Sequence, residues 1–228
     1  MRKGVLLLLT LALVACGGGG GGGPSPTIAP AVRDQLAADA AVLQLSDLPR
    51  QFAALGSESS SDQAPLSDPN QCIDPPPTQG AAMPELVVTA RAHRQYAIGL
   101  RLDAVIVRGT VEVFRDAESA AGKAAEFGRP EVIDCLEALY VQQLTALGGA
   151  VGEVTASPSK VEGLGDEQTG FVLSFVAALN GVEYPFAFEF DFTRVNRAGV
   201  TVSVLSPRGI DHALATSAMT PMVNRLQQ

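Results

Sequence analysis

The clearest pattern along the chain is an alternation of residues between positions 171 and 204, which is strictest for the six apolar residues from Val182 to Phe192. Alternation with a period of two places the apolar side chains on one face of a β-strand. Asn180-Gly181 separates two such runs and favours a hairpin, because both residues tolerate positive φ angles. A turn over residues 196–199 precedes a third run, so the pattern predicts an antiparallel meander with one buried face. Its apolar residues are Phe171, Leu173, Phe175, Ala177, Leu179, Val182, Tyr184, Phe186, Phe188, Phe190, Phe192, Val200, Val202 and Val204.

A weaker strand pattern precedes the meander. Residues 86–107 are strand-like without a clear period, whereas residues 105–113 place four valines on one face. Gly109 lies within this second run and is the candidate for a β-bulge. The region therefore predicts a half-buried strand that ends near residue 113.

Four other segments have helical periodicity or helix-boundary residues. Residues 32–42 are rich in alanine, and Asp116 is placed to cap a helix that continues to Phe127. Pro130 suits the first turn of a helix that continues to about Leu147. Residues 211–228 have the pattern of a C-terminal helix. The residues expected to face inward from this last segment are Ile210, Leu214, Met222 and Leu226.

Composition adds bounds on domain number and partners. The chain has 228 residues, of which 46% are hydrophobic, enough for one globular domain with a sizeable core. With the order of the predicted elements, this favours a single α+β domain over residues 31–228, in which an antiparallel meander packs against helices. The net charge is −8 and no basic run with interleaved aromatic residues occurs. We therefore exclude nucleic acid as a partner.

Residues 1–15 have the organisation of a secretory signal peptide. Arg2 and Lys3 form a positive start, and residues 5–15 are almost wholly apolar but too short to span a bilayer. The segment ends in Leu13-Val14-Ala15-Cys16, which resembles the lipobox of bacterial lipoproteins. We expect cleavage before Cys16 and acylation of its thiol, with palmitate among the attached chains. The alternative is an ordinary signal peptide followed by a chance cysteine.

A flexible tether follows the cleavage point. Residues 16–30 contain an uninterrupted glycine run followed by three prolines. Glycine has no side chain to bury and has the most backbone freedom to lose on folding. The segment therefore predicts a spacer between lipidated Cys16 and the domain.

The other two cysteines, Cys72 and Cys135, are expected to form a disulfide. An exported protein folds in an oxidising compartment, and acylation of Cys16 leaves these two as a pair. Closing a loop of this length contributes roughly 4 kcal/mol in the chain-entropy model. The alternatives are a metal site, for which His93 and His212 lack ligand spacing, and a reactive thiol.

Three carboxylates share the polar face of the central meander strand and are candidates for paired acid–base chemistry: Glu183, Glu189 and Asp191. Arg194 and Arg197 follow closely in the sequence. We therefore favour a solvated strand face with exposed ion pairs over a catalytic site.

Nucleophilic catalysis has little support in the sequence. No Gly-x-Ser-x-Gly motif occurs, although His212, Asp211 and a serine are available for a triad. We expect both histidines, His93 and His212, to be surface residues. Neither a metal ligand set nor a cofactor motif is recognised, so the chain is predicted not to be an enzyme.

The phenylalanine-rich strand suggests an apolar ligand face. Its residues are Tyr184, Phe186, Phe188 and Phe190, and the Ser- and Pro-rich segment 56–84 is long enough to cover them. The alternative is that these aromatic side chains form the core beneath the helices.

Five short stretches together resemble the extracytoplasmic sensor-like domains of actinobacterial lipoproteins and of PknH-type serine/threonine kinases. The resemblance covers most of residues 45–226 and implies an antiparallel sheet packed by helices, with a cleft for an unknown ligand. The kinase domains carry two disulfides, whereas this chain can form one. The stretches are residues 45–49 (LSDLP), 111–117 (VEVFRDA), 132–136 (VIDCL), 164–167 (LGDE) and 197–202 (RAGVTV).

The sequence therefore predicts a cell-envelope lipoprotein with a non-enzymatic ligand-binding or sensor-like domain. It would be anchored on the outer face of the cytoplasmic membrane or in the outer membrane. The expected partners are membrane lipid, through acylated Cys16, and an unidentified small molecule, lipid or envelope protein. The alternatives are a structural or interaction lipoprotein that assists an envelope complex, and a hydrolase.

Overall fold

The computed structural model describes most of the region predicted to be globular. Residues 1–28 lie outside the described set, so the predicted signal peptide, Cys16 and most of the tether have no structural counterpart here, and neither does most of segment 56–84. The described residues are 29–54, 72, 87–99, 104–146, 149–159, 161, 163–179 and 181–228.

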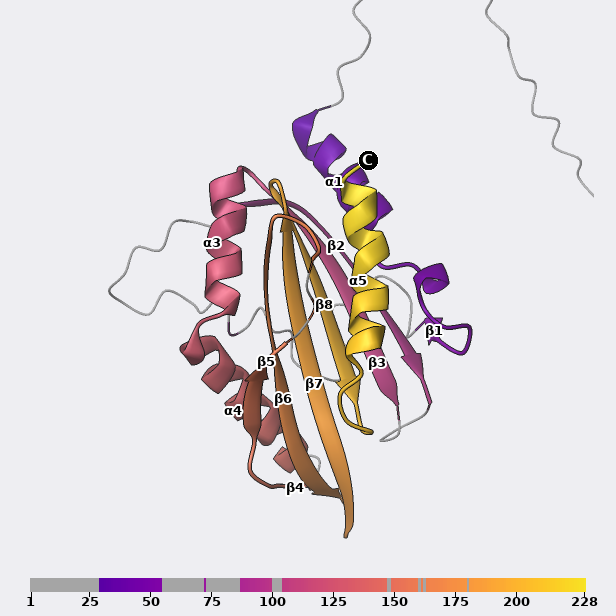
Figure 1. The fold of residues 1–228 in the computed structure, drawn as a ribbon, viewed down its shortest axis with the longest axis vertical. Coiled ribbons are helices and arrows are strands. Elements are labelled where there is room, and N and C mark those ends of the chain that lie inside the picture. Colours follow the sequence, from indigo (N-terminus) through magenta and orange to yellow (C-terminus); the bar gives the residue numbers. More distant parts are fainter. Residues whose placement is uncertain are drawn as a thin grey trace, which may run out of the picture.

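One antiparallel sheet organises these residues (Figure 1). Its strands follow the order β1-β2-β3-β8-β7-β6-β4, and β5 also pairs with β6. The strands are β1 (Ala53–Ala54), β2 (Val88–Ile98), β3 (Val105–Phe114), β4 (Ala150–Val151), β5 (Thr155–Pro158), β6 (Glu167–Leu179), β7 (Val182–Val195) and β8 (Ala198–Ser206).

Helices occupy the positions that the sequence predicts. The Asp116 side chain caps one of them by accepting a hydrogen bond from the backbone N–H of Ser119 at 2.8 Å. Among the described residues, no helix combines the length and hydropathy required to cross a membrane. The helices are α1 (Pro30–Ala41), the 3₁₀ turn η1 (Leu45–Asp47), α3 (Ala117–Phe127), α4 (Pro130–Ala146) and α5 (His212–Leu226). The chain therefore forms a single α+β domain, as the sequence predicts.

The central hairpin forms where the sequence predicts it. Phe171 of β6 lies opposite Phe190 of β7, and Leu173 lies opposite Phe188. Gly181 in the connecting turn has φ of +77°, which glycine adopts without steric cost. Strand β8 pairs with the other edge of β7, which confirms the antiparallel meander.

Helices cover both faces of the sheet, whereas the alternation predicts one buried face. Successive residues of a strand point to opposite faces. The Phe192 ring lies 5.2 Å from the ring of Phe127 in α3, whereas the Thr193 hydroxyl contacts the Met219 sulfur in α5 at 3.0 Å. Helix α5 packs on β8, β7 and β3, and Figure 1 shows it running beside β3 and β8, with α3 and α4 on the other side. The polar alternation of β7 therefore does not mark a solvated surface.

Gly109 lies in a regular strand and does not form the predicted bulge. It lies opposite Arg94 of β2 and Val202 of β8 without a register shift. A Cβ atom at this position would lie 2.4 Å from the Leu43 side chain and 3.0 Å from the Met222 sulfur. The glycine is therefore required because α5 and the segment after α1 approach the sheet backbone closely.

The predicted disulfide between Cys72 and Cys135 is present, with Cα atoms 5.7 Å apart. It joins residue 72 to α4. Cys72 is buried, but Cys135 is exposed instead of lying on the apolar side of α4. Ile210 is 45% exposed and does not face inward as predicted, because it precedes α5, whereas Met222 within the helix is buried.

Candidate functional site

The carboxylates of β7 lie in the protein interior, which corrects the expected solvated face. Glu189 is 2% exposed and Asp191 is 3% exposed, whereas Glu183 near the start of the strand is exposed. The reason is the position of α5, which packs on this face of β7 and β8. Only Glu189 and Asp191 of the three predicted acids are therefore brought together in a buried site.

The arginines expected to neutralise these acids bind elsewhere. Arg194 is one residue out of phase with the carboxylates, so its side chain lies on the other face and pairs with Asp166 and Glu167 at 3.2 Å each. Arg197, in the turn after β7, pairs with Asp34 of α1. Neither arginine compensates the buried carboxylates.

Ser159 reaches the same site from the end of β5. Its backbone N–H donates to the Gly170 carbonyl at 3.0 Å, and Gly170 lies opposite Asp191 in the register of β6 and β7. A Cβ at Gly170 would lie 2.6 Å from Asp191 Oδ1 and 3.0 Å from Ser159 Cβ. Glycine at this position therefore lets the serine and the carboxylate meet across β6.

Hydrogen bonds join the polar groups into one cluster. The Ser159 hydroxyl donates to Asp191 Oδ1 in a short contact and lies 3.5 Å from Glu189 Oε1. His212, the first residue of α5, places Nδ1 2.5 Å from the same Glu189 oxygen. We call Ser159, Glu189, Asp191 and His212 the acidic cluster.

The two histidines occupy different environments. His93 is exposed on β2, as the sequence predicts. The His212 side chain is 39% exposed, and it also bonds to buried Glu189, a contact that the prediction of a surface residue did not include. Its position is set by the N-cap of α5, where Asp211 accepts a hydrogen bond from Leu214 N–H at 3.1 Å.

The cluster leaves polar atoms without partners. Within the part of the chain that the structure describes, Glu189 Oε2, Asp191 Oδ2 and Gln168 Nε2 are buried and make no hydrogen bond. Buried polar groups are nearly always paired, and an unpaired one carries a desolvation penalty of about 1–3 kcal/mol. Buried polar atoms without hydrogen-bond partners are typical of a binding site in which the ligand supplies the missing partner.

Burial raises the pKa of Asp191 from 3.8 to about 7. The main cause is desolvation, and the nearby Glu189 charge raises the pKa further. The Ser159 hydrogen bond and the His212 charge oppose this rise only in part. The neighbours of Asp191 across the sheet are Gly170 and buried Val202, which offer no compensating charge.

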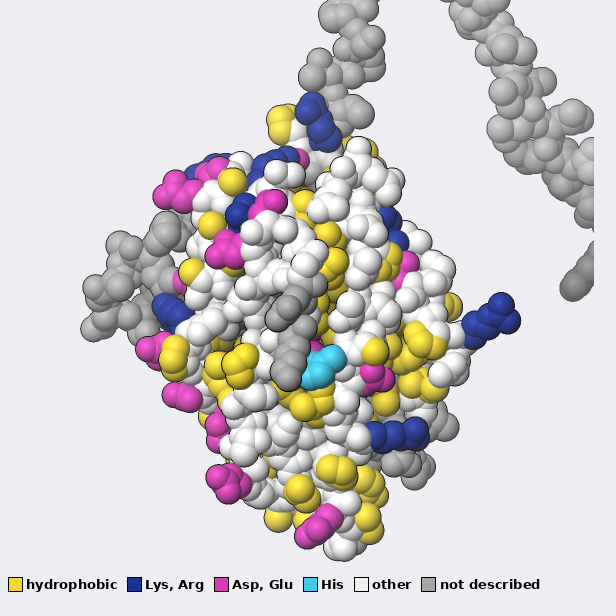
Figure 2. All heavy atoms as spheres, viewed as in Figure 1, with side chains coloured by type: hydrophobic (Ala, Val, Ile, Leu, Met, Phe, Trp, Pro, Cys, Tyr) yellow, Lys and Arg dark blue, Asp and Glu magenta, His cyan; other side chains and the backbone are white. Residues whose placement is uncertain are grey.

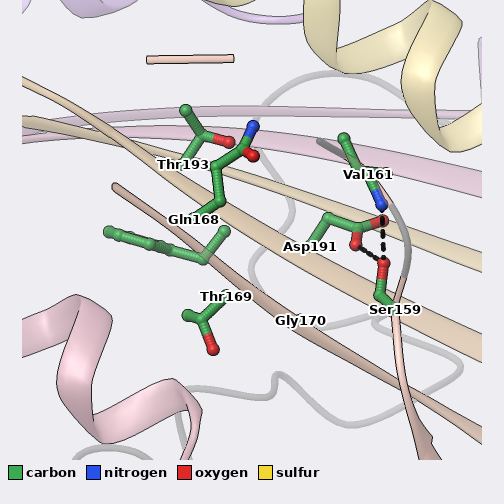
Figure 3. A pocket seen from close by; sticks show the side chains of 8 residues that line it. Ser159, Val161, Gln168, Thr169, Gly170, Asp191 and Thr193 are labelled. Atoms are coloured by element: carbon green, nitrogen blue, oxygen red, sulfur yellow. Dashed lines mark hydrogen bonds between the residues drawn. The ribbon is translucent and has the colours of Figure 1, made fainter. Parts of the chain in front are cut away.

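A cavity of about 220 Å³ adjoins the cluster. Figure 3 shows the Ser159 and Asp191 side chains pointing toward each other at its edge, with Gln168 and Thr193 beside them. The lining contains hydroxyl, amide and carboxylate groups, so the cavity is polar. The residues that line it are Ser159, Val161, Gln168, Thr169, Gly170, Asp191, Phe192 and Thr193.

The arrangement does not match a serine hydrolase. Such an enzyme needs a hydrogen bond from the nucleophilic hydroxyl to an imidazole. Ser159 and His212 each bond to a carboxylate instead. Within the described residues, no group of three or more His, Cys, Asp and Glu side chains is placed to hold a metal ion. The cluster therefore has the groups of a polar binding site rather than an activated nucleophile.

The suggested apolar ligand face lies on the opposite side of the sheet from this cavity. Phe186, Phe188 and Phe190 are buried, and Tyr184 is partly exposed. The Phe188 ring lies 4.3 Å from the ring of Tyr140 in α4. Phe188 and Phe190 pack as core beneath α3 and α4, so a ligand could reach them only after a helix moved, whereas Phe186 packs against Phe175 of β6 in a separate cluster. Most of the segment suggested to cover them lies outside the described residues.

Comparison with known proteins supports the fold. No protein-family model matches the sequence, and no curated protein does either. Among solved structures, the chain is similar to the extracellular domain of PknH from Mycobacterium tuberculosis, with a TM-score of 0.50 and 11% sequence identity. The match covers 85% of this chain and 96% of that one. At this identity the likeness shows a shared fold and not a shared ligand or activity.

Proposed function

We propose that this protein is a lipid-anchored extracytoplasmic lipoprotein whose domain binds a small polar ligand without catalysing a reaction. The ligand site is the cavity beside the acidic cluster. The observation that carries the proposal is Asp191, a carboxylate that is 3% exposed, lines the cavity and has one oxygen without a partner.

Three independent features support a location outside the cytoplasm. The first residues have the organisation of a signal peptide and end in a lipobox-like motif at Cys16. The Cys72–Cys135 disulfide is typical of an oxidising compartment. The fold resembles that of the extracellular domain of PknH.

A binding role fits the chemistry better than catalysis. Burial of the Asp191 carboxylate costs free energy, and the chain has this residue here although an apolar residue would avoid the cost. A ligand that hydrogen-bonds to Asp191 Oδ2 would offset this penalty, because an oxygen that lacks a partner would gain one. Ser159 and His212 have side chains suited to nucleophilic chemistry, but each bonds to a carboxylate and not to the other.

Replacing the lipidation residue (Cys16→Ala) is expected to release the protein from membranes. Two or more acyl chains anchor a protein stably, because each buried CH₂ contributes about 0.8 kcal/mol, and the variant has none. Fractionation of expressing cells, with intact-mass analysis of the purified chain, measures the change. Recovery of unmodified wild-type chain from the cytoplasm would overturn the anchor, and Glu183→Gln, at an exposed position, serves as the control that keeps the lipid and the disulfide.

A ligand at the cavity is expected to stabilise the purified full chain. At a concentration of 100 times its Kd, a ligand adds about 2.7 kcal/mol, which raises Tm by roughly 5–10 °C for a protein of this size. A thermal-shift screen with amines, glycans, lipids and cell-wall fragments measures this rise. The shift should be lost in Asp191→Asn and kept in Glu183→Gln, an exposed acid of the same strand. A screen without any shift, or equal shifts in both variants, counts against this site.

A further inference from the structure

The site's chemistry narrows the ligand class, on the assumption that the proposed binding function holds. We infer that the cavity beside the acidic cluster takes a primary ammonium group, either on a small free amine or on a lipid headgroup. The ammonium would lie against Asp191 Oδ2 and donate its remaining hydrogens to neighbouring hydroxyl and amide oxygens.

Charge is the first argument for an ammonium. The described lining of the cavity contains one carboxylate, Asp191, and no arginine, lysine or histidine. A second carboxylate, Glu189, lies one alternation away on β7 and is also buried. A buried anion becomes favourable when a cation pairs with it and the pair is hydrogen-bonded. An anionic ligand would add a third negative charge and is therefore disfavoured.

Donor count separates a primary ammonium from other cations. An –NH₃⁺ group has three N–H donors and no acceptor. The lining offers the unpartnered Asp191 oxygen together with the side-chain oxygens of Ser159, Gln168 and Thr193, all of which can accept. A quaternary ammonium has no N–H and is held by aromatic faces. Phe192 is the one aromatic residue of the described lining, and its ring packs against Phe127 of α3.

The size of the cavity limits what can enter. Its volume of about 220 Å³ is below the roughly 300–1,000 Å³ of sites that enclose a drug-sized ligand. A small amine fits entirely, and a larger molecule can place only its amine-bearing end inside. The acidic side chains that Figure 2 shows over α3 and α4, together with the net charge of −8, favour approach of a cation.

Binding of an ammonium should compete with a proton at Asp191. Among the described residues, the groups that face this carboxylate are Glu189 on its own strand, His212 from α5 and the hydroxyl of Ser159, which follows β5, whereas β6 and β8 present Gly170 and Val202. Burial and Glu189 raise the pKa of Asp191 to about 7. The affinity for an ammonium should therefore increase from pH 6 to pH 8, as the proton leaves.

The test uses three compounds of similar size and the full chain carrying Cys16→Ala, which prevents lipid-mediated association with vesicles. Ethanolamine carries a primary ammonium, choline keeps the charge but has no N–H donor, and ethylene glycol is neutral. NMR-detected titration gives a Kd for each compound. We expect ethanolamine to bind most tightly, and Asp191→Asn to weaken it about 10- to 100-fold, the effect of losing a hydrogen bond to a charged group. Glu183→Gln should leave the Kd unchanged.

Vesicles distinguish the two sources of the ammonium. Co-sedimentation with phosphatidylethanolamine but not phosphatidylcholine vesicles identifies a headgroup, whereas binding of free ethanolamine alone identifies a small amine. If ethylene glycol or choline binds as tightly as ethanolamine, or if Asp191→Asn does not weaken ethanolamine, the ammonium assignment is wrong. If a glycan or peptide from the screen then binds in a manner that requires Asp191, the proposed binding function still holds. If neither experiment finds a ligand, both the ammonium assignment and the binding function are overturned.

Discussion

Truncation of one central phenylalanine (Phe190→Ala) is expected to lower the free energy of unfolding by about 3–5 kcal/mol. Phe190 is 0% exposed, and its ring centroid lies 5.1 Å from that of Phe171 and 4.3 Å from that of Phe188. The variant loses the transfer free energy of the ring and leaves a cavity between the sheet and its helices. Because a domain is stable by only about 5–15 kcal/mol, this single change consumes much of the total.

Urea unfolding measures the loss, and it also distinguishes core from ligand face. Val182→Ala on the same strand is the control, because Val182 is 52% exposed and its truncation should change stability by less than about 0.5 kcal/mol. A Phe190→Ala variant as stable as the wild type would show that this side of the sheet is open to ligands instead of packed. Figure 1 shows α3 and α4 along this side.

The meander could be predicted from sequence because its signals are local. Alternation with a period of two, the Asn180-Gly181 turn and the Asp116 cap each depend on residues near each other in the chain. The structure confirms the hairpin between β6 and β7 and the cap at Asp116. The disulfide between Cys72 and Cys135 could be predicted because few pairings were available.

The polar site could not be predicted in the same way, because it depends on contacts between distant segments. Alternation indicates that Glu189 and Asp191 share a face, but not that α5 covers this face. Ser159 and Gly170 meet Asp191 only through the pairing of β5 with β6 and of β6 with β7. Sequence alone therefore favoured a solvated surface.

One signal in the sequence does point toward burial. The strands on either side of β7 place Val172 and Val204 opposite Glu189. Acids flanked by apolar residues in both neighbouring strands suggest a face that is not solvated. These apolar neighbours of Glu189 can be identified only when the strand order is known. For Gly109 the same limit holds, since the close approach of Leu43 and Met222 is a tertiary contact.

The burial of Asp191 links the site to stability, and the sign of the effect follows from its pKa. In the folded protein the pKa is about 7, compared with 3.8 for an ordinary aspartate. Between these two values the folded state keeps a proton that the unfolded state releases, so stability falls as pH rises. Asp34, whose pKa is lowered chiefly by its hydrogen bond to Arg197, loses its contribution only below its ordinary value of 3.8. The titration of Asp34 therefore does not overlap the pH range in which Asp191 changes the stability.

Asp191→Asn is accordingly expected to make the protein more stable at pH 8 and no more stable at pH 4. A difference of about three pKa units corresponds to about 4 kcal/mol at most, with a slope no steeper than about 1.4 kcal/mol per pH unit. The asparagine keeps the shape of the side chain and an oxygen for the Ser159 hydroxyl, but it carries no charge at any pH. Urea unfolding of both chains from pH 4 to pH 8 measures the difference, in which the contributions of other titrating groups largely cancel. Glu183→Gln should run parallel to the wild type, because this acid is exposed. Parallel curves for Asp191→Asn would mean that the carboxylate is solvated in the folded protein, and the buried site would lose its physical basis.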